Sequence, residues 1–403
     1  MSEWRQYYLT ELGTLNRGKS KHRPRWAEHL YGGPYPFIQT GDIAAANKYI
    51  NSYQQTYSED GLAQSKLWDK NTLCITIAAN IAEVAILNFP ACFPDSILGF
   101  IPDDKKADLD FIFYTLTFFK DRIKKLAIGS VQDNINIGTF NNIKFSCPPL
   151  QEQKRIAAVL SCLDDKIENL RKQNETLEKI AQTLFKHWFI DFEFPNENGQ
   201  PYRSSGGAMQ PSELGAIPAG WRVGKLGDEF NILMGQSPVG SSYNQNGEGL
   251  IFFQGRTDFG FRFPTIRLFT TEPKRIANKF DVLVSVRAPV GDINVAFEKC
   301  CIGRGLSAVS SNHQSYCLYK LKSFKKFFDV FESEGTVFGS VNKTSFNELK
   351  SIIPNTEIIQ AFEDIVSPID RKIFLNENQI QTLTKTRDTL LPELMSGKLR
   401  IPE

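Results

Sequence analysis

Several patterns that would mark a metalloprotein, an exported protein or a membrane protein are missing from this 403-residue chain. Its seven cysteines form no Cys-x-x-Cys pair and have no histidine at zinc-finger spacing, so we expect buried free thiols and no bound metal. No charged-then-apolar leader opens the chain, and no apolar run reaches the roughly 18 residues that cross a bilayer. We therefore expect a cytoplasmic protein that does not enter membranes.

Signs of catalysis are equally scarce. The four histidines are scattered, no glycine-rich cofactor loop or methyltransferase-type Asn-Pro-Pro-aromatic run occurs, and the net charge is only +2. Asp95, Asp103 and Lys105 in PDSILGFIPDDKK match the divalent-metal motif of many nucleases, but the motif is short and has no counterpart in the second half of the chain. We predict no catalytic residue and no cofactor bound by this chain.

An internal duplication is present, and it decides the architecture. One long helical pattern begins at Pro148 and another at Pro354, and the two align without a gap at an offset of 206 residues. Upstream of the helices, TFNNIK matches SFNELK at the same offset, and PFIQTGDI corresponds to FFQGRTDFG. The order is therefore globule, long helix, globule, long helix.

Both helical patterns carry an apolar stripe at seven-residue spacing, which is typical of helices that pack against another helix. Because both copies lie in one chain, we predict that they pair with each other in antiparallel orientation. The residues expected to pack between them are Ile156, Leu163, Leu170, Leu177 and Leu184 in the first copy and Phe362, Ile369, Leu383 and Leu390 in the second.

Short β-type runs such as LCITIAA and DVLVSV occur in both globules. The predicted fold class is α+β, with two similar α/β domains separated by two long antiparallel coiled-coil helices in a pseudo-twofold internal repeat. A stretch rich in Pro, Gly and Ser after the first helix predicts an exposed connector. The expected segments are a first globular domain at 1–147, the first helix at 148–190, the connector at 191–220, a second globular domain at 221–353 and the second helix at 354–403.

The stretch GTLNRGKS (Gly13–Ser20) fits the pattern of a phosphate-binding loop, with Lys19 and Ser20 in the nucleotide-contacting places. A working loop continues into a helix after its lysine, whereas Pro24 interrupts this segment. The second copy of the repeat reads MGQS and has no lysine. We therefore expect no nucleotide binding here.

The same segment is strongly basic, with basic residues at alternate positions. In an extended conformation these side chains would project from one face and form a strip for phosphates; the alternative is a solvated loop. The residues of this strip are Arg17, Lys19, Lys21, Arg23 and Arg25.

The second globule carries a stronger binding signal, because seven basic residues stand against three acidic ones between Gln254 and Pro289. Arg287 in SVRAPVGD and Arg304 in IGRGL stand in turn-rich contexts, from which a guanidinium group can pair bidentately with guanine. Glutamine can pair with adenine in the same way. The candidate base-contacting residues are Gln39, Gln236, Gln254, Arg287 and Arg304, and Arg256 is a further DNA-binding candidate. For each of them singly the alternative is an ordinary surface side chain.

Several stretches occur in order along essentially the whole chain: PPLQEQKRIAAVLSCLDDKIE, SSGGAMQPSELGAIPAGW, FFQGRTDFG, LVSVRAPVGDIN, CIGRGLSA and TVFGSVNK. In these stretches the chain resembles the specificity subunits of type I restriction-modification enzymes. The resemblance implies two target-recognition domains that each read half of a split DNA site, with the paired helices setting the distance between the halves. It implies base contacts by Arg287, Arg304, Gln39 and Gln254, and it adds Lys343 of TVFGSVNK as a DNA contact.

The resemblance also implies partners: double-stranded DNA, two modification (methyltransferase) subunits and the restriction (helicase-nuclease) subunits. S-adenosylmethionine, ATP and magnesium would be bound by those subunits. The first domain reads ITIAANIAE where the second has RAPVG, so its base-reading residues are less well assigned. Two alternatives stay open: a coiled-coil scaffold that does not read DNA, and an NTPase or nuclease built on the motifs described above.

Overall fold

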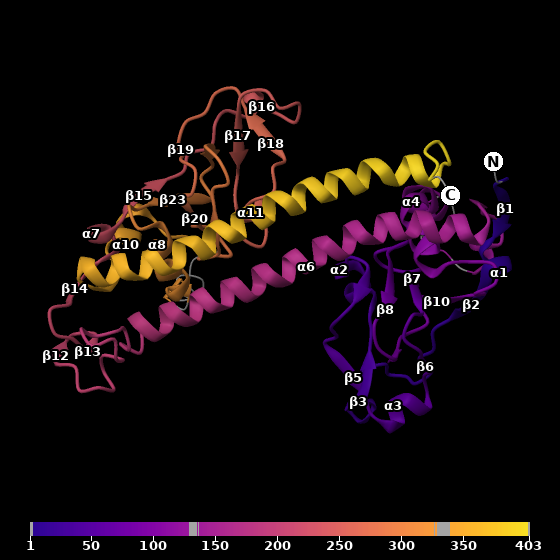
Figure 1. The fold of residues 1–403 in the computed structure, drawn as a ribbon, viewed down its shortest axis with the longest axis horizontal. Coiled ribbons are helices and arrows are strands. Elements are labelled where there is room, and N and C mark those ends of the chain that lie inside the picture. Colours follow the sequence, from indigo (N-terminus) through magenta and orange to yellow (C-terminus); the bar gives the residue numbers. More distant parts are fainter. Residues whose placement is uncertain (1–2, 129–134, 136, 326, 329–338, 402–403) are drawn as a thin grey trace. The chain divides into compact units, whose positions relative to one another are not determined.

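The computed structural model describes residues 3–128, 135, 137–325, 327–328 and 339–401 (Figure 1). The chain forms two compact units, and each unit is described by itself. Unit 1 comprises Met1–Arg171 and Asn378–Glu403, and unit 2 comprises Lys172–Glu377. The long helices α6 (Leu150–Phe189) and α11 (Thr356–Met395) are each divided between the two units, α6 after Arg171 and α11 after Glu377.

Unit 1 contains two β-sheets and a two-stranded ribbon. Its strands are β1 (Arg5–Tyr8), β2 (Gly13–Arg17), β3 (Tyr31–Phe37), β4 (Tyr49–Ile50), β5 (Gln55–Tyr57), β6 (Leu67–Trp68), β7 (Leu73–Thr76), β8 (Val84–Leu87), β9 (Ala91–Cys92), β10 (Ile97–Pro102) and β11 (Lys144–Cys147). Its shorter helices are α1 (Leu9–Leu12), η1 (Glu28–Leu30), α2 (Thr40–Ala45), α3 (Glu59–Ala63), α4 (Leu109–Ile128) and α5 (Ile137–Phe140). The sheet orders are β2-β10-β7-β8-β4 and β5-β3-β9-β6, and the ribbon is β1-β11.

Unit 2 contains two β-sheets and two ribbons. Its strands are β12 (Met209–Ser212), β13 (Gly215–Pro218), β14 (Arg222–Lys225), β15 (Asn231–Met234), β16 (Tyr243–Asn244), β17 (Leu250–Phe253), β18 (Leu268–Thr270), β19 (Ile276–Ala277), β20 (Val282–Ser285), β21 (Ile293–Val295), β22 (Cys300–Ile302), β23 (Leu306–Ser310) and β24 (Lys350–Ile353). Its shorter helices are α7 (Leu226–Glu229), η2 (Gly240–Ser242), η3 (Arg256–Asp258), α8 (Gln314–Ser323) and α10 (Lys343–Asn347). The sheet orders are β15-β23-β20-β21 and β16-β18-β17-β22-β19, and the ribbons are β12-β13 and β14-β24.

The two units repeat one topology. The order β2-β10-β7-β8 in unit 1 corresponds to β15-β23-β20-β21 in unit 2, and β5-β3-β9-β6 corresponds to β18-β17-β22-β19. In each second sheet one strand pair is parallel, β3 with β9 and β17 with β22. In each unit a two-stranded ribbon, β1-β11 or β14-β24, also joins the strand that begins the globular domain to the strand that leads into a long helix. The predicted α+β fold with two similar domains is confirmed.

The long helices pair antiparallel in both units, as predicted. In unit 1, Asp164 of α6 forms an ion pair with Arg387 of α11 at 2.7 Å. In unit 2, Phe185 of α6 meets Phe362 of α11 with ring centroids 5.7 Å apart. Within each unit the later residues of one helix therefore face the earlier residues of the other.

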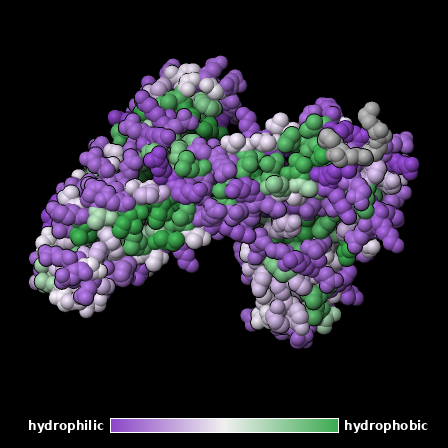
Figure 2. Space-filling view, viewed as in Figure 1, coloured by the Kyte–Doolittle hydropathy of each residue, from purple (hydrophilic) through white to green (hydrophobic). Residues whose placement is uncertain are grey.

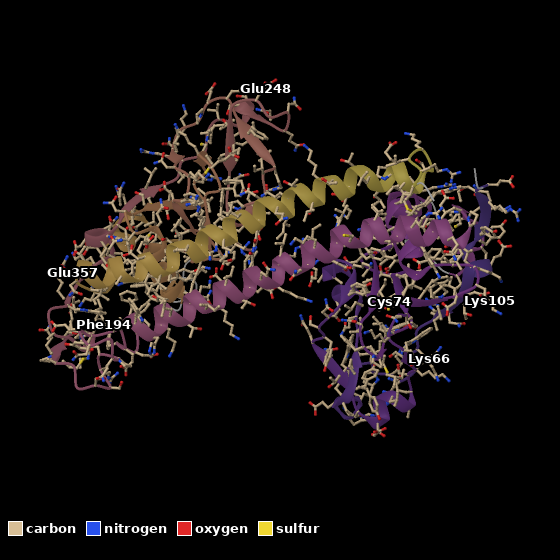
Figure 3. The ribbon with its side chains drawn as sticks, viewed as in Figure 1. Lys66, Cys74, Lys105, Phe194, Glu248 and Glu357 are labelled. Carbon is tan, nitrogen blue, oxygen red and sulfur yellow. The ribbon has the colours of Figure 1, made fainter. Side chains whose placement is uncertain are left out.

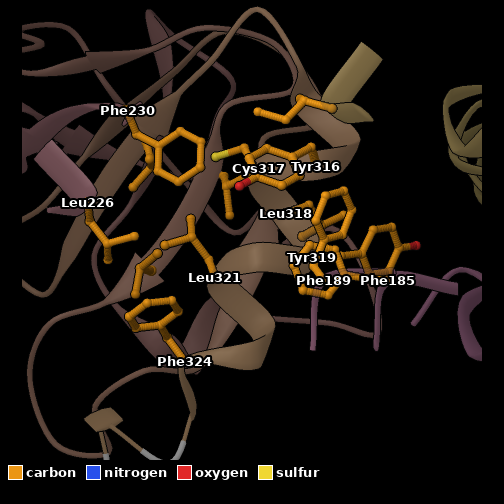
Figure 4. Packing of buried hydrophobic residues seen from close by; sticks show 14 of the residues in the cluster. Phe185, Phe189, Leu226, Phe230, Tyr316, Cys317, Leu318, Tyr319, Leu321 and Phe324 are labelled. Carbon is orange, nitrogen blue, oxygen red and sulfur yellow. The ribbon is translucent and has the colours of Figure 1, made fainter. Parts of the chain in front are cut away.

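The apolar stripes serve the domain cores as well as the helix pair. Leu170 and Leu383 belong to a small cluster between the helices in unit 1, whereas Phe362 is fully buried in the main core of unit 2. Of the other predicted packing residues, Ile156 is buried in the core of unit 1, Leu390 packs against that core, Leu177, Leu184 and Ile369 pack against the core of unit 2, and Leu163 is half-buried. Figure 4 shows how Phe185 and Phe189 of α6 meet Tyr316 and Tyr319 of α8 in this core.

The predicted connector at 191–220 is exposed over most of its length, but it is also folded. It contains the β12-β13 hairpin, and its aromatic and aliphatic side chains enter the core of unit 2. Phe194 stacks on Trp221, which follows the connector, at a centroid distance of 5.1 Å. The Pro, Gly and Ser content concealed these apolar anchors, whose burial stabilises the segment.

Figure 2 shows a largely hydrophilic surface with hydrophobic patches along the α6 and α11 portions of each unit. Among the described residues, no helix is sufficiently long and apolar to cross a bilayer. Six cysteines are buried free thiols, as expected, and Cys74 lies inside unit 1 (Figure 3). Cys162 on α6 is the exception, because it is exposed.

Candidate nucleic-acid interface

In unit 2, loops that follow several strands gather the predicted polar readers. Gln236 follows β15, Gln254 follows β17 and Arg287 follows β20, while Arg304 stands in the turn between β22 and β23. All four side chains are exposed. The strands that flank these loops, such as β17 and β20, are buried and hold the loops in fixed positions.

Backbone hydrogen bonds join these loops to one another. The amide of Gln236 donates to the carbonyl of Ile302 at 3.0 Å, and the amide of Val286 donates to the carbonyl of Gly305 at 3.0 Å. A side chain at Gly303 or Gly305 would meet the carbonyl of Gln254 at 2.9 Å. The glycines of IGRGL therefore permit the close approach that sets Arg304 beside Gln254.

A cleft of about 840 Å³ opens among these loops. Arg256 and Arg287 line it together with Asn294, and Gly255, Gly260 and Gly305 leave its backbone accessible. Guanidinium groups are donors that nucleic-acid phosphates and base edges accept. The Asn294 carboxamide is buried and already bonded to the Gly260 backbone, so it shapes the cleft and is not offered to a ligand. The cleft is therefore the leading candidate for a nucleic-acid site in this unit.

The arginines in the cleft, Arg256 and Arg287, and the nearby Arg304 differ in how they are held. Arg256 forms a close ion pair with Asp292, and Lys325 approaches the same carboxylate at 3.2 Å. Within the described part of the chain, neither Arg287 nor Arg304 has a carboxylate partner. Arg287 and Arg304 are therefore available to a ligand, whereas Arg256 is already neutralised in part.

Lys343 lies on a segment that runs beside the Arg287 turn. The amide of Val341 donates to the carbonyl of Val286 at 3.0 Å, and the amide of Ala288 donates to the carbonyl of Gly339 at 3.1 Å. Lys343 is exposed at the start of α10. The first part of the TVFGSVNK stretch, residues 336–338, lies outside the described residues.

In unit 1 the basic strip does not form one extended face. Strand β2 ends at Arg17, and the residues after it are irregular. Arg17 donates to the carbonyl of Asp95, Arg25 pairs with the Asp95 carboxylate at 2.8 Å, and Arg23 donates to backbone carbonyls of its own loop. The prediction of one face with five free basic side chains is wrong, because groups of the protein itself bind these three guanidinium groups. Within the described residues, the ammonium groups of Lys19 and Lys21 have no ion-pair partner.

The GTLNRGKS stretch lacks the geometry of a phosphate loop. The amide of Gly18 donates to the carbonyl of Ile97 at 2.8 Å, and the amide of Lys19 donates to the carbonyl of Phe93 at 3.1 Å. Amides that are bonded to carbonyls cannot cradle a phosphate. The segment after Lys19 is a series of bends and turns and not a helix.

The nuclease-like motif is also pulled apart by the fold. Strand β10 has six residues and separates Asp95 from Asp103 by about 20 Å. Lys105 lies at the edge of unit 1 (Figure 3), and Asp103 forms an ion pair with Lys106 at 3.2 Å. Over the described residues, no three His, Cys, Asp or Glu side chains are arranged to hold a metal ion.

Gln39 and Gln254 hold equivalent positions in the two units. Gln39 follows β3, and its amide donates to the Asp42 carboxylate at 2.8 Å. Gln254 follows β17, and its amide donates to the Asp258 carboxylate at 2.9 Å. Unlike Gln254, Gln39 donates its side-chain amide to Gln55.

Sequence reasoning missed a pair of buried clamps that join each domain to a long helix. In unit 1, Lys48 is 4% exposed, pairs with Asp110 at 3.1 Å and lies 5.4 Å from the ring centre of Tyr114. Tyr114 in turn donates its hydroxyl to Asp164 of α6. Burial, followed by the neighbouring Asp164 carboxylate, raises the pKa of Tyr114 and keeps this hydroxyl protonated.

Unit 2 repeats this clamp with an arginine guanidinium group in place of the lysine ammonium group. Arg262 is 3% exposed, pairs with Asp370 of α11 at 3.0 Å and lies 5.5 Å from the ring centre of Tyr319. Tyr319 donates to Asp370 at 2.9 Å, and Arg262 also contacts Glu178 of α6. Arg262 is one of the seven basic residues between Gln254 and Pro289 that indicated a binding surface, but the structure buries it.

A signal for the clamps was present in the sequence. Asp164 and Asp370 are separated by the 206-residue offset of the helices, so both copies of the long helix carry an Asp at the same point. Tyr114 and Tyr319 also lie in corresponding helices. The cations of the clamps, Lys48 and Arg262, come from loops that the tertiary fold brings against these tyrosines.

Two α/β units of one topology on a pair of long helices, with an arginine-lined cleft, define a duplicated DNA-recognition protein. Residues 1–179 and 218–385 match the family model of the type I restriction modification DNA specificity domain, and the chain belongs to this family. It is a non-catalytic specificity subunit of a type I restriction-modification complex, concerned with DNA recognition and complex assembly.

Relatives match along most of their length. The chain is 28% identical over 424 residues to the type I restriction enzyme MjaIX specificity subunit of Methanocaldococcus jannaschii, which covers 100% of this chain and 94% of the relative. It is 34% identical over 311 residues, 74% of this chain and 70% of the relative, to a protein of the same organism provisionally named the MjaX specificity subunit. The crystal structure of the S subunit from M. genitalium has the same fold, with a TM-score of 0.62, 19% identity and coverage of 98% and 96% of the two chains.

Proposed function

We propose that the two globular domains, residues 1–147 and 221–353, each read one half of a split DNA site, and that the paired helices set the gap between the halves. The observation that carries the proposal is that two exposed arginines have no carboxylate partner in the described chain: Arg287, which lines the unit 2 cleft, and Arg304, which stands on the neighbouring turn beside Gln254. Unpaired guanidinium groups on rigid loops suit bidentate contacts with guanine. Lys19, Lys21 and Lys343 supply the phosphate contacts that do not depend on sequence.

The helices also serve as the assembly surface for the catalytic partners in this proposal. Exposed apolar side chains on α6 and α11 favour protein contacts, as at Ile180, Ile365 and Leu375, which are 49%, 47% and 54% exposed. The partners are two modification subunits and the restriction subunits. S-adenosylmethionine, ATP and magnesium are bound on those partners, and the complex works in the cytoplasm on double-stranded DNA.

The proposal is tested by expressing the chain with its modification subunit in a host and sequencing the host DNA by a methylation-sensitive method. The expected result is methylation at one split motif, with two short defined halves and an unread gap of fixed length. Methylation without sequence preference would instead favour a scaffold that only joins partners. ATP or metal binding by the purified chain alone would favour the enzyme alternatives.

A further inference from the structure

The turn between β7 and β8 in unit 1 has the same hydrogen-bonded frame as the arginine-bearing turn between β20 and β21 in unit 2. The amide of Thr76 donates to the carbonyl of Glu83 at 2.9 Å, and the Thr76 hydroxyl accepts from the amide of Glu83 at 3.0 Å. Ser285 makes the same two bonds with Asp292, each at 2.9 Å. The two turns are therefore equivalent although ITIAANIAE and RAPVG do not look alike.

The backbone also agrees at the left-handed residue that closes each turn, whereas the tips differ: Ala79 has a φ of 48°, and its counterpart Ala288 precedes a cis proline. Ala82 has a φ of 62° and donates its amide to the carbonyl of Thr76, and Gly291 has a φ of 80° and donates to the carbonyl of Ser285. The hydroxyls of Thr76 and Ser285 each donate to the carbonyl two residues before the left-handed residue, at Asn80 and at Pro289. This register aligns residue 78 with residue 287 and residue 80 with residue 289.

The surroundings of the two turns match as well. The amide of Ile77 donates to the carbonyl of Ser96 at 2.9 Å, as that of Val286 does to the carbonyl of Gly305. Glu83 is held by Lys120 and Lys124 of α4, just as Asp292 is held by Lys325. The turn of unit 1 therefore occupies the place in its unit that the Arg287 turn occupies in the cleft of unit 2.

The side chains that this turn presents are different. Ala78 stands where unit 2 has Arg287, so no guanidinium group is available at that place. The polar residue at the tip is Asn80, which is exposed and whose side chain makes no hydrogen bond within the described part of the chain. A carboxamide pairs bidentately with N6 and N7 of adenine, whereas a guanidinium group pairs with guanine.

We propose that Asn80 reads an adenine in the half-site of unit 1, at the turn where Arg287 reads a guanine in the half-site of unit 2. The assignment rests on the proposed function of the two domains. Asn80 is a specificity-determining residue that touches DNA, and it has no part in the folding of the turn, because its carbonyl, and not its side chain, makes the bonds that hold the frame.

The test is an Asn80→Ala variant of the full chain, assembled with its modification subunit and read by methylation-sensitive sequencing. Loss of one bidentate base contact should lower the preference at one A·T position of the first half-site by about fivefold to 150-fold, from roughly 1–3 kcal/mol of discrimination. The second half-site and the gap should stay unchanged. Asn47→Ala is the matched control, because Asn47 is an exposed asparagine of the same unit that lies outside the turn. An unaltered first half-site in Asn80→Ala overturns the proposal.

A second variant exchanges residues 78–82 for residues 287–291, which the common frame should accept. The first half-site should then lose its adenine and gain a guanine at that position. If this variant still methylates the original first half-site, the proposal is overturned. This result decides the question even if the Asn80→Ala complex modifies no DNA. Failure of the proposed function is distinguishable, because the wild-type complex would then methylate no split motif at all.

Discussion

The side-chain amide of Asn376 on α11 donates to the side-chain oxygen of Asn174 on α6 at 2.8 Å, and the two residues are 1% and 0% exposed. Asn174 uses its own amide to donate to Glu377 at 2.7 Å. A satisfied polar pair inside an apolar helix interface selects one register, because a slipped helix would bury these amides without partners. The pair therefore explains why Asn376 stands where the heptad pattern expects an apolar residue.

Replacing only Asn376 with Leu should destabilise the protein by about 1–3 kcal/mol, because Asn174 would keep a buried acceptor without its donor. The double variant Asn174→Leu and Asn376→Leu should recover part of this loss, since a matched apolar pair removes both buried amides, while Glu377 loses the bond from Asn174. Denaturant unfolding of the single and double variants measures the difference. Equal stability of the single variant and the wild type would show that the hydrogen bond contributes nothing.

Arg262→Met should cost about 3–5 kcal/mol, because it leaves the Asp370 carboxylate without its cation and the buried Glu178 carboxylate with Lys322 alone. Lys274→Met, an exposed position of the same unit, should stay within about 0.5 kcal/mol of the wild type. Thermal or denaturant unfolding measures the stability of both variants. Similar losses of stability in the two would show that the Arg262 clamp does not hold the domain on the long helices.

The same network sets an acid dependence. Burial alone would raise the pKa of Glu178, but the charges of Arg262 and Lys322 outweigh it and lower that pKa. A carboxyl group with a lowered folded-state pKa stabilises the fold above its unfolded-state pKa of about 4.3, and this stability is lost as the pH falls through the folded-state pKa. Wild-type stability should therefore fall steeply below about pH 4.3, and Arg262→Met should show a shallower fall.

Lys19→Ala should weaken DNA binding to a similar degree on all sequences. Loss of one phosphate contact should reduce the slope of the logarithm of the binding constant against the logarithm of salt concentration by about 0.9. Binding titrations on specific and random duplexes at several salt concentrations measure this effect. ATP affinity in the micromolar range that disappears in Lys19→Ala would contradict the argument from the occupied amides of Gly18 and Lys19.

Arg287→Ala and Arg304→Ala should each relax one position of the second half-site and leave the first half-site intact. A lost bidentate guanine contact costs about 1–3 kcal/mol. Methylation-sensitive sequencing reads the outcome, and Arg203→Ala, an exposed arginine of the connector, is the control. Wild-type selectivity in either variant would exclude that arginine as a base reader.

The helices are expected to act as the ruler of the gap. Each has 40 residues, about 60 Å at 1.5 Å per residue. Four residues inserted after Leu170, with four more after Asn376, add about 6 Å and slightly more than one helical turn, which keeps the apolar stripes nearly in step. The gap should grow by one or two base pairs, about 3.4 Å each, with both half-sites unchanged. A folded variant that still methylates DNA at the original spacing would refute the ruler.

The duplication, the long helices and their pairing were predictable, because they are written in local periodicities and in a constant offset of 206 residues. A heptad stripe has the same meaning wherever the helix lies. The family resemblance likewise depends on contiguous stretches such as RAPVG and IGRGL, and the predicted residues Gln236, Gln254, Arg287 and Arg304 do meet in one region of unit 2.

The partner of each polar side chain was decided by the tertiary structure. Arg17 and Arg25 look like free cations until the turn that carries Asp95 is folded against them, and Arg262 looks exposed until α6 and α11 enclose it. The equivalence of the Asn80 and Arg287 turns was likewise invisible, because it lies in backbone hydrogen bonds that many sequences can make. Burial and hydrogen bonding depend on contacts between residues that are distant in the chain, and local patterns carry little information about them.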